Sequence, residues 1–316
     1  MNNIIKTKPR SILAIDELTK EDVYLLFSLA SKCKAVGSPM NGSSSGKILL
    51  TAFFEASTRT RLSFESAALR NNMKVLSILE PKYTGIAKGE SLEDIGYMLN
   101  SYADVVVVRH GDLADFEALR SSISIPLINA GNGTKEHPTQ ALADWFTLGE
   151  WFPSLVYGSV SPDKKIHLGI VGVPSMMRSV KSFLLLARYF IKNIDQITLV
   201  TEKSNTASVL GVEIESVLSE YEDKIRITSN FEENIGLFDA TYINSIAYLE
   251  DGYHKLGSSY IISSASQLKT GSAVLHPLAR QAELSTDIDN TPHNYYFQQA
   301  ENAVFIRQAI LENIFS

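Results

Sequence analysis

The sequence has very little cysteine and no long apolar run. Cys33 is the single cysteine among 316 residues, so neither an internal disulfide nor a cysteine-rich metal site can form. One thiol, with no secretory apolar core near the start of the sequence, favours a reducing, cytoplasmic location. A membrane-spanning helix needs about 18 consecutive apolar residues. The sequence contains no such run, and we therefore expect no membrane partner.

An excess of basic residues is also lacking. Lys and Arg number 29 against 35 Asp and Glu, giving a net charge of −6, so general nucleic-acid binding is not expected. The charged fraction of 20% and the hydrophobic fraction of 45% are typical of globular proteins, which excludes disordered, collagen-like and coiled-coil chains. At about 100–200 residues per domain, the length predicts two domains.

Several motifs of cofactor and nucleophile chemistry are missing. The sequence has no Walker A motif, no G-x-S-x-G motif and no cluster of His, Cys and carboxylates at metal-binding spacing. The segment GIVGVP (169–174) resembles a dinucleotide loop but lacks the third glycine and carries a proline in the turn. We therefore predict neither a metal nor a cofactor.

Apolar runs that alternate with helical segments fill the chain. A helix is predicted over 13–36, capped by Asp16 or Thr19, and a closing amphipathic helix over 292–315. The apolar runs predict strands at 47–54, 74–79, 103–110, 125–131, 167–173, 196–201, 225–228, 239–244, 260–264 and 272–277. This alternation indicates an α/β fold of two similar lobes, each a parallel sheet flanked by helices, with the active site in the cleft between them.

Polar side chains follow several of these strands directly. Residues 57–60 (Ser-Thr-Arg-Thr) follow the first strand, Arg109 ends the third, and His137 and Gln140 follow the fourth. Ligands of open α/β sheets bind outside the carboxyl ends of strands, and a helix start with an arginine suits a phosphate. Each group also has a structural alternative: residues 57–60 as a solvated helix start, Arg109 paired with an acid, and His137 as a capping residue.

Several segments together resemble the aspartate/ornithine carbamoyltransferase family, and most closely its aspartate branch. The matching segments are FFEASTRTRLSFESA (53–67), KGESLEDI (88–95), VVVRH (106–110), NAGNGTKEHPTQALAD (129–144), VLHPL (274–278) and DIDNTPHNYYFQQAENAVFIRQAIL (287–311). The resemblance implies a carbamoyl-phosphate domain over 1–150, completed by a C-terminal helix over 292–316, and an amino-acid domain over 151–291. It also implies a homotrimer with shared active sites, a role in pyrimidine biosynthesis, and a possible regulatory or dihydroorotase partner.

The same resemblance assigns roles to individual residues. Carbamoyl phosphate is expected to contact Ser57, Thr58, Arg59, Thr60, Arg109, His137, Gln140, Thr84 and Lys88. Catalytic roles fall to Arg59, Thr60, Arg109, His137 and Lys88. Lys88 and Thr84 are expected to reach in from an adjacent subunit. The amino-acid substrate is expected to contact Arg178, Lys88, Leu278 and, at a position usually held by arginine, Ser245.

The departures from the family pattern gather on the amino-acid side. Ser245 and Ala247 stand where the aspartate branch usually has arginine and glutamine, and Ala279 replaces a proline. The overall resemblance to the aspartate branch, with Arg178 in place, nevertheless implies carbamoyl transfer to L-aspartate. A carbamoyltransferase for another amine and a non-catalytic subunit that binds carbamoyl phosphate remain the alternatives.

Overall fold

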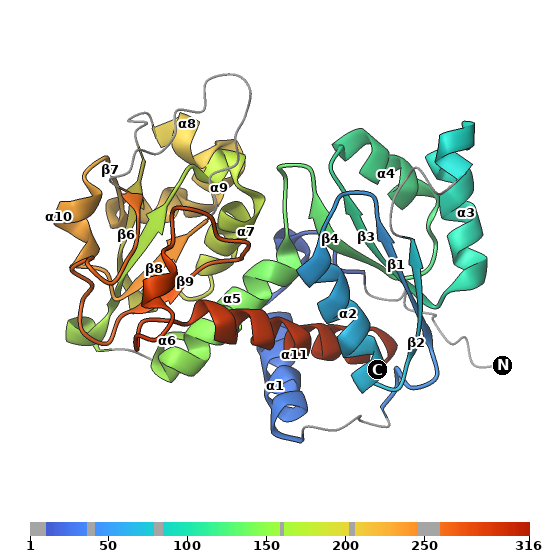
Figure 1. Ribbon diagram of the computed structural model, residues 1–316, viewed down its shortest axis with the longest axis horizontal. Coiled ribbons are helices and arrows are strands. Elements are labelled where there is room, and N and C mark those ends of the chain that lie inside the picture. The colour runs from blue at the N-terminus through green and yellow to red at the C-terminus, as the bar shows by residue number, and fades with distance from the viewer. Residues whose placement is uncertain (1–10, 37–41, 79–84, 159–160, 202–205, 245–259) are drawn as a thin grey trace. The chain divides into compact units, whose positions relative to one another are not determined.

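The computed structural model describes residues 11–36, 42–78, 85–158, 161–201, 206–244 and 260–316. The chain divides into two compact units, Met1–Thr139 with Val304–Ser316, and Gln140–Ala303 (Figure 1). The division falls inside helices α5 (Pro138–Trp151) and α11 (Tyr296–Phe315). The domain boundaries implied by the resemblance stay a prediction.

The first unit is built on a four-stranded parallel sheet in the order β2-β1-β3-β4. Its strands are β1 (Ile48–Phe53), β2 (Lys74–Ile78), β3 (Val105–His110) and β4 (Leu127–Asn132). Its helices are α1 (Lys20–Val36), α2 (Thr58–Arg70), α3 (Leu92–Tyr102) and α4 (Leu113–Ser122). The predicted parallel α/β arrangement of this half is confirmed.

Alternate residues of the first sheet face different helices. Leu50 and Val106 pack with α3 and α4, which lie side by side in Figure 1. Thr51 points to the opposite face, where its hydroxyl donates to Glu65 of α2 at 3.1 Å. Because β3 is buried on both faces, its run of four valines is apolar throughout, as expected for a central parallel strand.

The C-terminal part of α11 belongs to the first unit. Asn71 donates to the backbone oxygen of Gln308 at 3.0 Å, and the Gln308 amide donates back to Asn71 Oδ1 at 3.0 Å. Glu312 accepts hydrogen bonds from the hydroxyl of buried Ser44 at 2.7 Å and from the N–H of Ser43. These bonds join the end of the chain to the turn that precedes β1.

The second unit contains a five-stranded parallel sheet in the order β7-β6-β5-β8-β9. Its strands are β5 (Ile166–Val171), β6 (Ile194–Val200), β7 (Ile225–Thr228), β8 (Ala240–Ile243) and β9 (Ala273–Leu275). Besides most of α5, its helices are α6 (Pro153–Tyr157), α7 (Arg178–Ala187), α8 (Thr206–Leu210), α9 (Val212–Leu218) and α10 (Phe231–Ile235).

Trp145 fastens α5 to the rest of the second unit. It is fully buried, its indole N–H donates to the backbone oxygen of Phe183 at 2.9 Å, and its ring stacks on Phe183 and Phe190. Helix α5 is therefore a fixed support for the polar residues on its first turns.

Three predicted elements differ from the structure. The helix expected over 13–36 is a short 3-10 turn (Ile15–Glu17) followed by α1, because Leu18 is extended and Thr19 caps α1 through its bonds with Asp22. The run 260–264 forms only an isolated bridge, from Ile262 to Leu284. The last helix begins at Tyr296 rather than at 292. None of the helices in the described ranges combines the length and apolar character needed to cross a membrane.

Candidate active site

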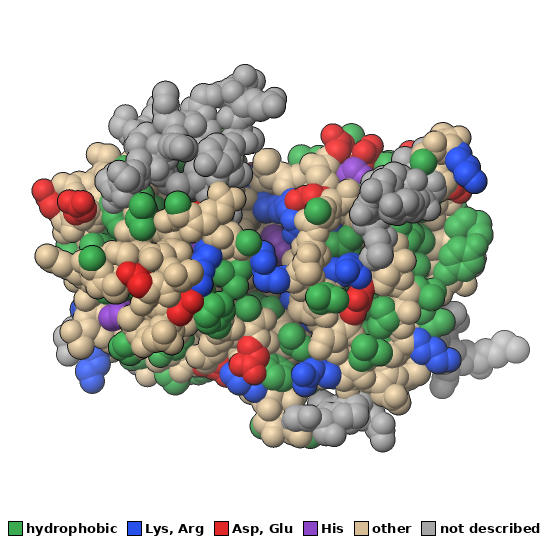
Figure 2. All heavy atoms as spheres, in the orientation of Figure 1, with side chains coloured by type: hydrophobic (Ala, Val, Ile, Leu, Met, Phe, Trp, Pro, Cys, Tyr) green, Lys and Arg blue, Asp and Glu red, His purple; other side chains and the backbone are tan. Residues whose placement is uncertain are grey.

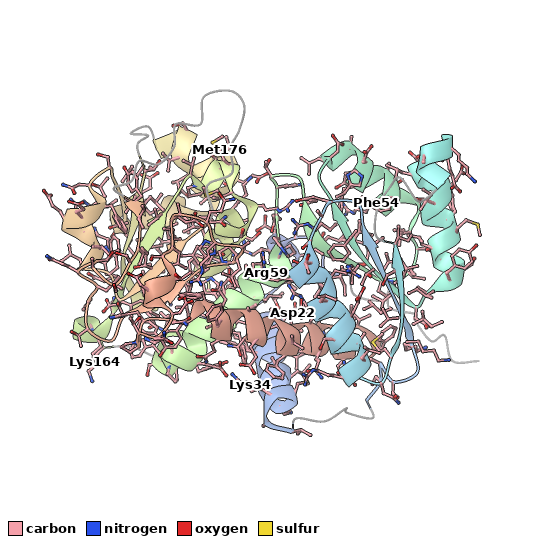
Figure 3. All side chains as sticks on the ribbon, viewed as in Figure 1. Asp22, Lys34, Phe54, Arg59, Lys164 and Met176 are labelled. Atoms are coloured by element: carbon pink, nitrogen blue, oxygen red, sulfur yellow. The ribbon has the colours of Figure 1, made fainter. Side chains whose placement is uncertain are left out.

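Helix α2 starts directly beyond β1 and presents the predicted phosphate-binding residues. Ser57 precedes the helix in an extended conformation, and Thr58, Arg59 and Thr60 form its first turn. Within the described chain, the Ser57 hydroxyl accepts no hydrogen bond from this turn, so it leaves the first N–H groups of α2 available to an anion. Figure 3 labels Arg59 at this helix start, and partial burial lowers the pKa of its guanidinium from the ordinary value. The group stays cationic at neutral pH.

Arg109 lies at the end of β3 and forms an ion pair. Its Nη2 donates to Glu55 Oε1 at 2.7 Å, and its side chain is 13% exposed. The structural alternative for Arg109 is therefore present, because an acid does hold it. Glu55 orients the guanidinium of Arg109, and Glu55 itself lies two positions before Ser57 in the sequence.

His137 is 5% exposed and immediately precedes α5. Its neighbour Glu136 bridges Asn132 at the end of β4, where Asn132 N–H donates to the Glu136 oxygen at 3.2 Å. The Glu136 carboxylate also accepts the backbone N–H of Ile15 at 2.9 Å. The backbone around His137 is thus held against the end of β4.

Strand register brings these groups to one edge of the first sheet. Arg109 on β3 pairs with Phe53, the last residue of β1, and His110 pairs with Asn132, the last residue of β4. The start of α2, Arg109 and the segment that carries His137 therefore follow the carboxyl ends of adjacent strands. The predicted clustering of polar groups at these strand ends is present in the fold.

Gln140 lies on the first turns of α5 and is held by an acid on the same helix. Its Nε2 donates to Asp144 Oδ1 at 2.7 Å, and Gln140 is only 8% exposed. Asp144 is fully buried and also accepts from the Tyr242 hydroxyl at 2.9 Å. Burial and the Asp144 carboxylate raise the pKa of Tyr242 well above its ordinary value, so its hydroxyl is a proton donor.

The predicted amino-acid residues follow adjacent strands of the second sheet. Arg178 is the first residue of α7, which follows β5, and it is half-buried. Asn244, which follows β8, donates to Ser179 on the same helix turn at 3.4 Å. Leu278 lies beyond β9, has φ of 55° and precedes a cis peptide bond to Ala279. Because β5, β8 and β9 are neighbours, these residues lie along one edge of the sheet.

Two buried contacts support the loop that carries Leu278. His276 Nδ1 accepts the N–H of Leu278 at 2.8 Å, so the proton on Nε2 faces Glu283 Oε1 at 2.9 Å. Burial by itself raises the pKa of Glu283, but hydrogen bonds from His276 and from the N–H of Gln281 hold it below its ordinary value. Arg280 forms an ion pair with Asp289 through both terminal nitrogens, which lowers the pKa of Asp289.

Three predicted site residues, Thr84, Ser245 and Lys88, are not placed in these clusters by the structure. Thr84 and Ser245, with Ala247, lie outside the described residues. Lys88 is exposed and ends a 3-10 turn (Gly85–Lys88) that follows β2 in the sequence. Among the described residues, no group of His, Cys, Asp and Glu is arranged to hold a metal ion.

The acids that hydrogen-bond to the predicted site residues and to their supporting loop were not predicted from the sequence. Asp144 follows Gln140 by four positions, a spacing that places two side chains on one helix face and provides a usable signal. Glu55 stands beside the 57–60 motif, but nothing in the sequence pairs it with Arg109. Glu283 has no recognisable spacing to His276, since a loop brings them together.

Comparison with known proteins agrees with this architecture. Residues 10–150 match the family model "Aspartate/ornithine carbamoyltransferase, carbamoyl-P binding domain", and residues 164–314 match "Aspartate/ornithine carbamoyltransferase, Asp/Orn binding domain". The aspartate carbamoyltransferase catalytic subunit of Picrophilus torridus is 34% identical, over 97% of this chain and 98% of its own length. That of Thermofilum pendens is also 34% identical, over 96% and 94%.

Solved structures show the same similarity. Aspartate transcarbamoylase from Trypanosoma cruzi in complex with N-(phosphonacetyl)-L-aspartic acid has a TM-score of 0.84 and 30% identity, covering 97% of this chain and 96% of that chain. The complex of that enzyme with carbamoyl phosphate and aspartate has a TM-score of 0.82 and 32% identity, with the same coverage.

The fold and the polar edges define a class: an α/β protein with two parallel sheets, each carrying cationic and hydrogen-bonding groups beyond its strand ends. Family models match both halves, and relatives above 30% identity span almost the whole chain. The chain belongs to the aspartate/ornithine carbamoyltransferase family, and the predicted resemblance is confirmed.

Proposed function

We propose that this protein transfers the carbamoyl group of carbamoyl phosphate to the amino group of L-aspartate, giving N-carbamoyl-L-aspartate and phosphate. The observation that carries the proposal is the gathering of the α2 start, Arg109 and the His137 segment at one edge of the first sheet. The relatives named as aspartate carbamoyltransferases support aspartate as the acceptor.

In this reaction the amine attacks the carbonyl carbon, and negative charge develops on the carbonyl oxygen. The bond between that carbon and the phosphate oxygen then breaks, and the departing phosphate takes up the proton that the amine loses. Arg109, His137 and Thr60 are the donors that stabilise the carbonyl oxygen, because preplaced donors act on charge as it forms. The N–H groups of α2 and Arg59 neutralise the phosphate that leaves. Gln140 binds the carbamoyl nitrogen.

The second unit supplies the acceptor side. Arg178 binds the α-carboxylate of the amino acid, and the backbone oxygen of Leu278 accepts a hydrogen bond from the attacking amine. Ser245 stands at the position where the aspartate branch usually has the arginine that reads the acceptor side chain. No covalent enzyme intermediate is required, so the rate depends mainly on alignment of the two substrates.

We also propose a homotrimer in which Thr84 and Lys88 complete a neighbouring active site. Large apolar side chains are exposed on α2 and β2, at 50% for Leu62, 63% for Leu69 and 46% for Leu76. Leu62 and Leu69 line a shallow groove on α2. Figure 2 shows a further apolar patch over α3, where Tyr97 and Tyr102 are exposed. Exposed apolar surface of this kind marks interaction sites.

A different amine acceptor is the second candidate, favoured by Ser245 and Ala247. Loss of a charge-assisted bond to a substrate carboxylate costs about 1.5–3 kcal/mol. If these positions read the acceptor side chain, the double variant Ser245→Arg with Ala247→Gln lowers the KM for aspartate.

The test is a phosphate-release assay with carbamoyl phosphate and a panel of amino acids, with the product identified by mass spectrometry. Formation of N-carbamoyl-L-aspartate supports the proposal. Turnover only with a different amine would identify that amine, and not aspartate, as the acceptor. No turnover across the panel, with carbamoyl phosphate still bound in calorimetry, contradicts it and favours a non-catalytic subunit.

A further inference from the structure

One buried carboxylate oxygen in the second unit receives two glutamine side chains. Asp144 Oδ1 accepts the Nε2 of Gln140 at 2.7 Å and the Nε2 of Gln299 at 2.5 Å. The other oxygen, Oδ2, accepts the hydroxyl of Tyr242 at 2.9 Å. Asp144 has no exposed surface. Its hydrogen bonds therefore come from fixed protein groups, and both glutamine amides are oriented by the same atom.

The chemistry of the carboxylate decides which end of the Gln140 amide faces it. A carboxylate only accepts hydrogen bonds, so the –NH2 end of Gln140 must face Asp144, and Oε1 must face away. Within the part of the chain that the structure describes, no donor reaches Gln140 Oε1, and Gln140 retains a small exposed surface. The Oε1 end of the amide, which faces away from Asp144, is thus an acceptor that remains available to a ligand donor.

We propose that Asp144 is a positioning residue that locks Gln140 as a hydrogen-bond acceptor, so that the site selects a donor substrate bearing –NH2 over one bearing –CH3. This inference rests on the proposed function, which places Gln140 on the carbamoyl nitrogen. A carbamoyl group donates to Gln140 Oε1, whereas an acetyl group at the same position leaves that oxygen without a donor. A site that binds through a hydrogen bond discriminates against an analogue that lacks it.

The second glutamine extends the same support to the acceptor loop. Gln299 Oε1 accepts the backbone N–H of His276 at 2.9 Å, and His276 in turn accepts the N–H of Leu278. A continuous chain of hydrogen bonds therefore runs from Gln140 through Asp144, Gln299 and His276 to Leu278. One buried atom, Asp144 Oδ1, orients a donor-side group and supports an acceptor-side loop.

The test compares two stable phosphonates that differ in one group. Phosphonoacetamide carries the –NH2 of carbamoyl phosphate, and acetonylphosphonate carries –CH3 in its place. Calorimetry on the full chain measures the ratio of their dissociation constants. Wild type is expected to favour phosphonoacetamide, and Asp144→Asn is expected to reduce this preference about three- to tenfold, the worth of one neutral hydrogen bond. An asparagine Nδ2 can donate to Gln140 Oε1 and so permits the opposite orientation.

Tyr242→Phe is the matched control. It removes a hydrogen bond to the same buried carboxylate but leaves Oδ1 and its two glutamines in place. It is expected to lower the melting temperature while keeping the preference within about twofold of wild type. A wild-type preference in Asp144→Asn overturns the inference, as does an equal loss in Tyr242→Phe. A wild type that binds neither phosphonate overturns the proposed function instead.

A crystal structure of wild type with phosphonoacetamide tests the inference without any variant. The expected result keeps Gln140 Nε2 within 3.2 Å of Asp144 Oδ1 (about the upper limit for such a bond) while the other amide atom meets the ligand –NH2. A Gln140 amide that leaves Asp144 when the ligand binds contradicts the inference.

Discussion

Replacing Glu283 with alanine tests the buried pair beneath the loop that carries Leu278. Glu283 Oε1 accepts from His276 Nε2 at 2.9 Å and from the N–H of Gln281 at 2.8 Å. The His276 and Glu283 side chains are 0% and 5% exposed, so the His276 donor is not in contact with bulk solvent in the folded chain. Each buried donor left unsatisfied costs about 1–3 kcal/mol. We therefore expect Glu283→Ala to lower the free energy of unfolding of the second unit by about 3 kcal/mol.

Tryptophan fluorescence during urea unfolding measures this loss selectively. Both tryptophans of the chain, Trp145 and Trp151, lie in the second unit. With a slope of about 2 kcal/mol/M, a loss of about 3 kcal/mol moves the urea midpoint down by roughly 1.5 M. Glu301→Ala, at an exposed position on α11, is the control and is expected to stay within about 0.5 kcal/mol of wild type. An unchanged midpoint in Glu283→Ala would mean that the His276–Glu283 pair does not stabilise the second unit.

The contribution of Glu283 to the stability of the folded chain decreases at low pH. The pKa of Glu283 in the folded chain lies below its ordinary value, so its contribution is fully present above the unfolded pKa of about 4.3. The contribution is lost as the pH falls through the folded pKa. In the Glu283→Gln variant, the side chain at position 283 carries no charge at any pH. The stability difference between wild type and this variant is therefore expected to be constant from about pH 5 to 7 and to shrink below about pH 4.

Three further outcomes are expected. Arg59→Ala is expected to weaken carbamoyl-phosphate binding about 10- to 150-fold in calorimetry, the loss of one charge-assisted contact, with an unchanged circular dichroism spectrum; unaltered affinity rejects the phosphate assignment. Glu312→Ala removes the acceptor of buried Ser44 and is expected to speed hydrogen exchange in residues 42–53; unchanged exchange contradicts this contact. Leu69→Glu is expected to reduce the mass measured by sedimentation from a trimer to smaller species, whereas a persistent trimer moves the interface elsewhere.

Most of the fold is predictable because the order of apolar runs and helical segments is visible along the sequence. The valine run of β3 and the alternation of apolar runs with helices follow from a sheet covered on both faces, and both parallel sheets have this form. Of the two predicted caps, Thr19 is confirmed, but the helix predicted over residues 13–18 is wrong, because the apolar periodicity continues through Leu18. The N–H of Ile15 instead donates to Glu136, which is 121 positions away in sequence.

The run 260–264 shows a second limit of sequence patterns. Tyr260 and Ile262 are buried in the core of the second unit, but Ile262 pairs with Leu284 only at a single isolated bridge. Periodicity and burial alone do not separate a buried loop from a short strand. The sequence therefore predicts that these residues enter the core, and the strand assignment is wrong.

The candidate site divides in the same way. Groups at strand ends, such as Arg109 and the 57–60 segment, are predictable because parallel strands bring their carboxyl ends to one edge. The acids Glu55 and Glu283 are not predictable, since they reach their partners, Arg109 and His276, only through tertiary structure. Asp144 is the exception, because its spacing from Gln140 on one helix is visible in the sequence.

Calorimetric titration with N-(phosphonacetyl)-L-aspartic acid, the ligand of the Trypanosoma cruzi complex, tests whether one site of this protein binds both carbamoyl phosphate and aspartate. We expect this compound to bind more tightly than inorganic phosphate or L-aspartate alone, because it joins the groups that the two substrates present. Both Arg59→Ala and Arg178→Ala are expected to weaken it. Binding no tighter than that of phosphate alone, or equal binding by wild type and both variants, would contradict a shared site for the two substrates.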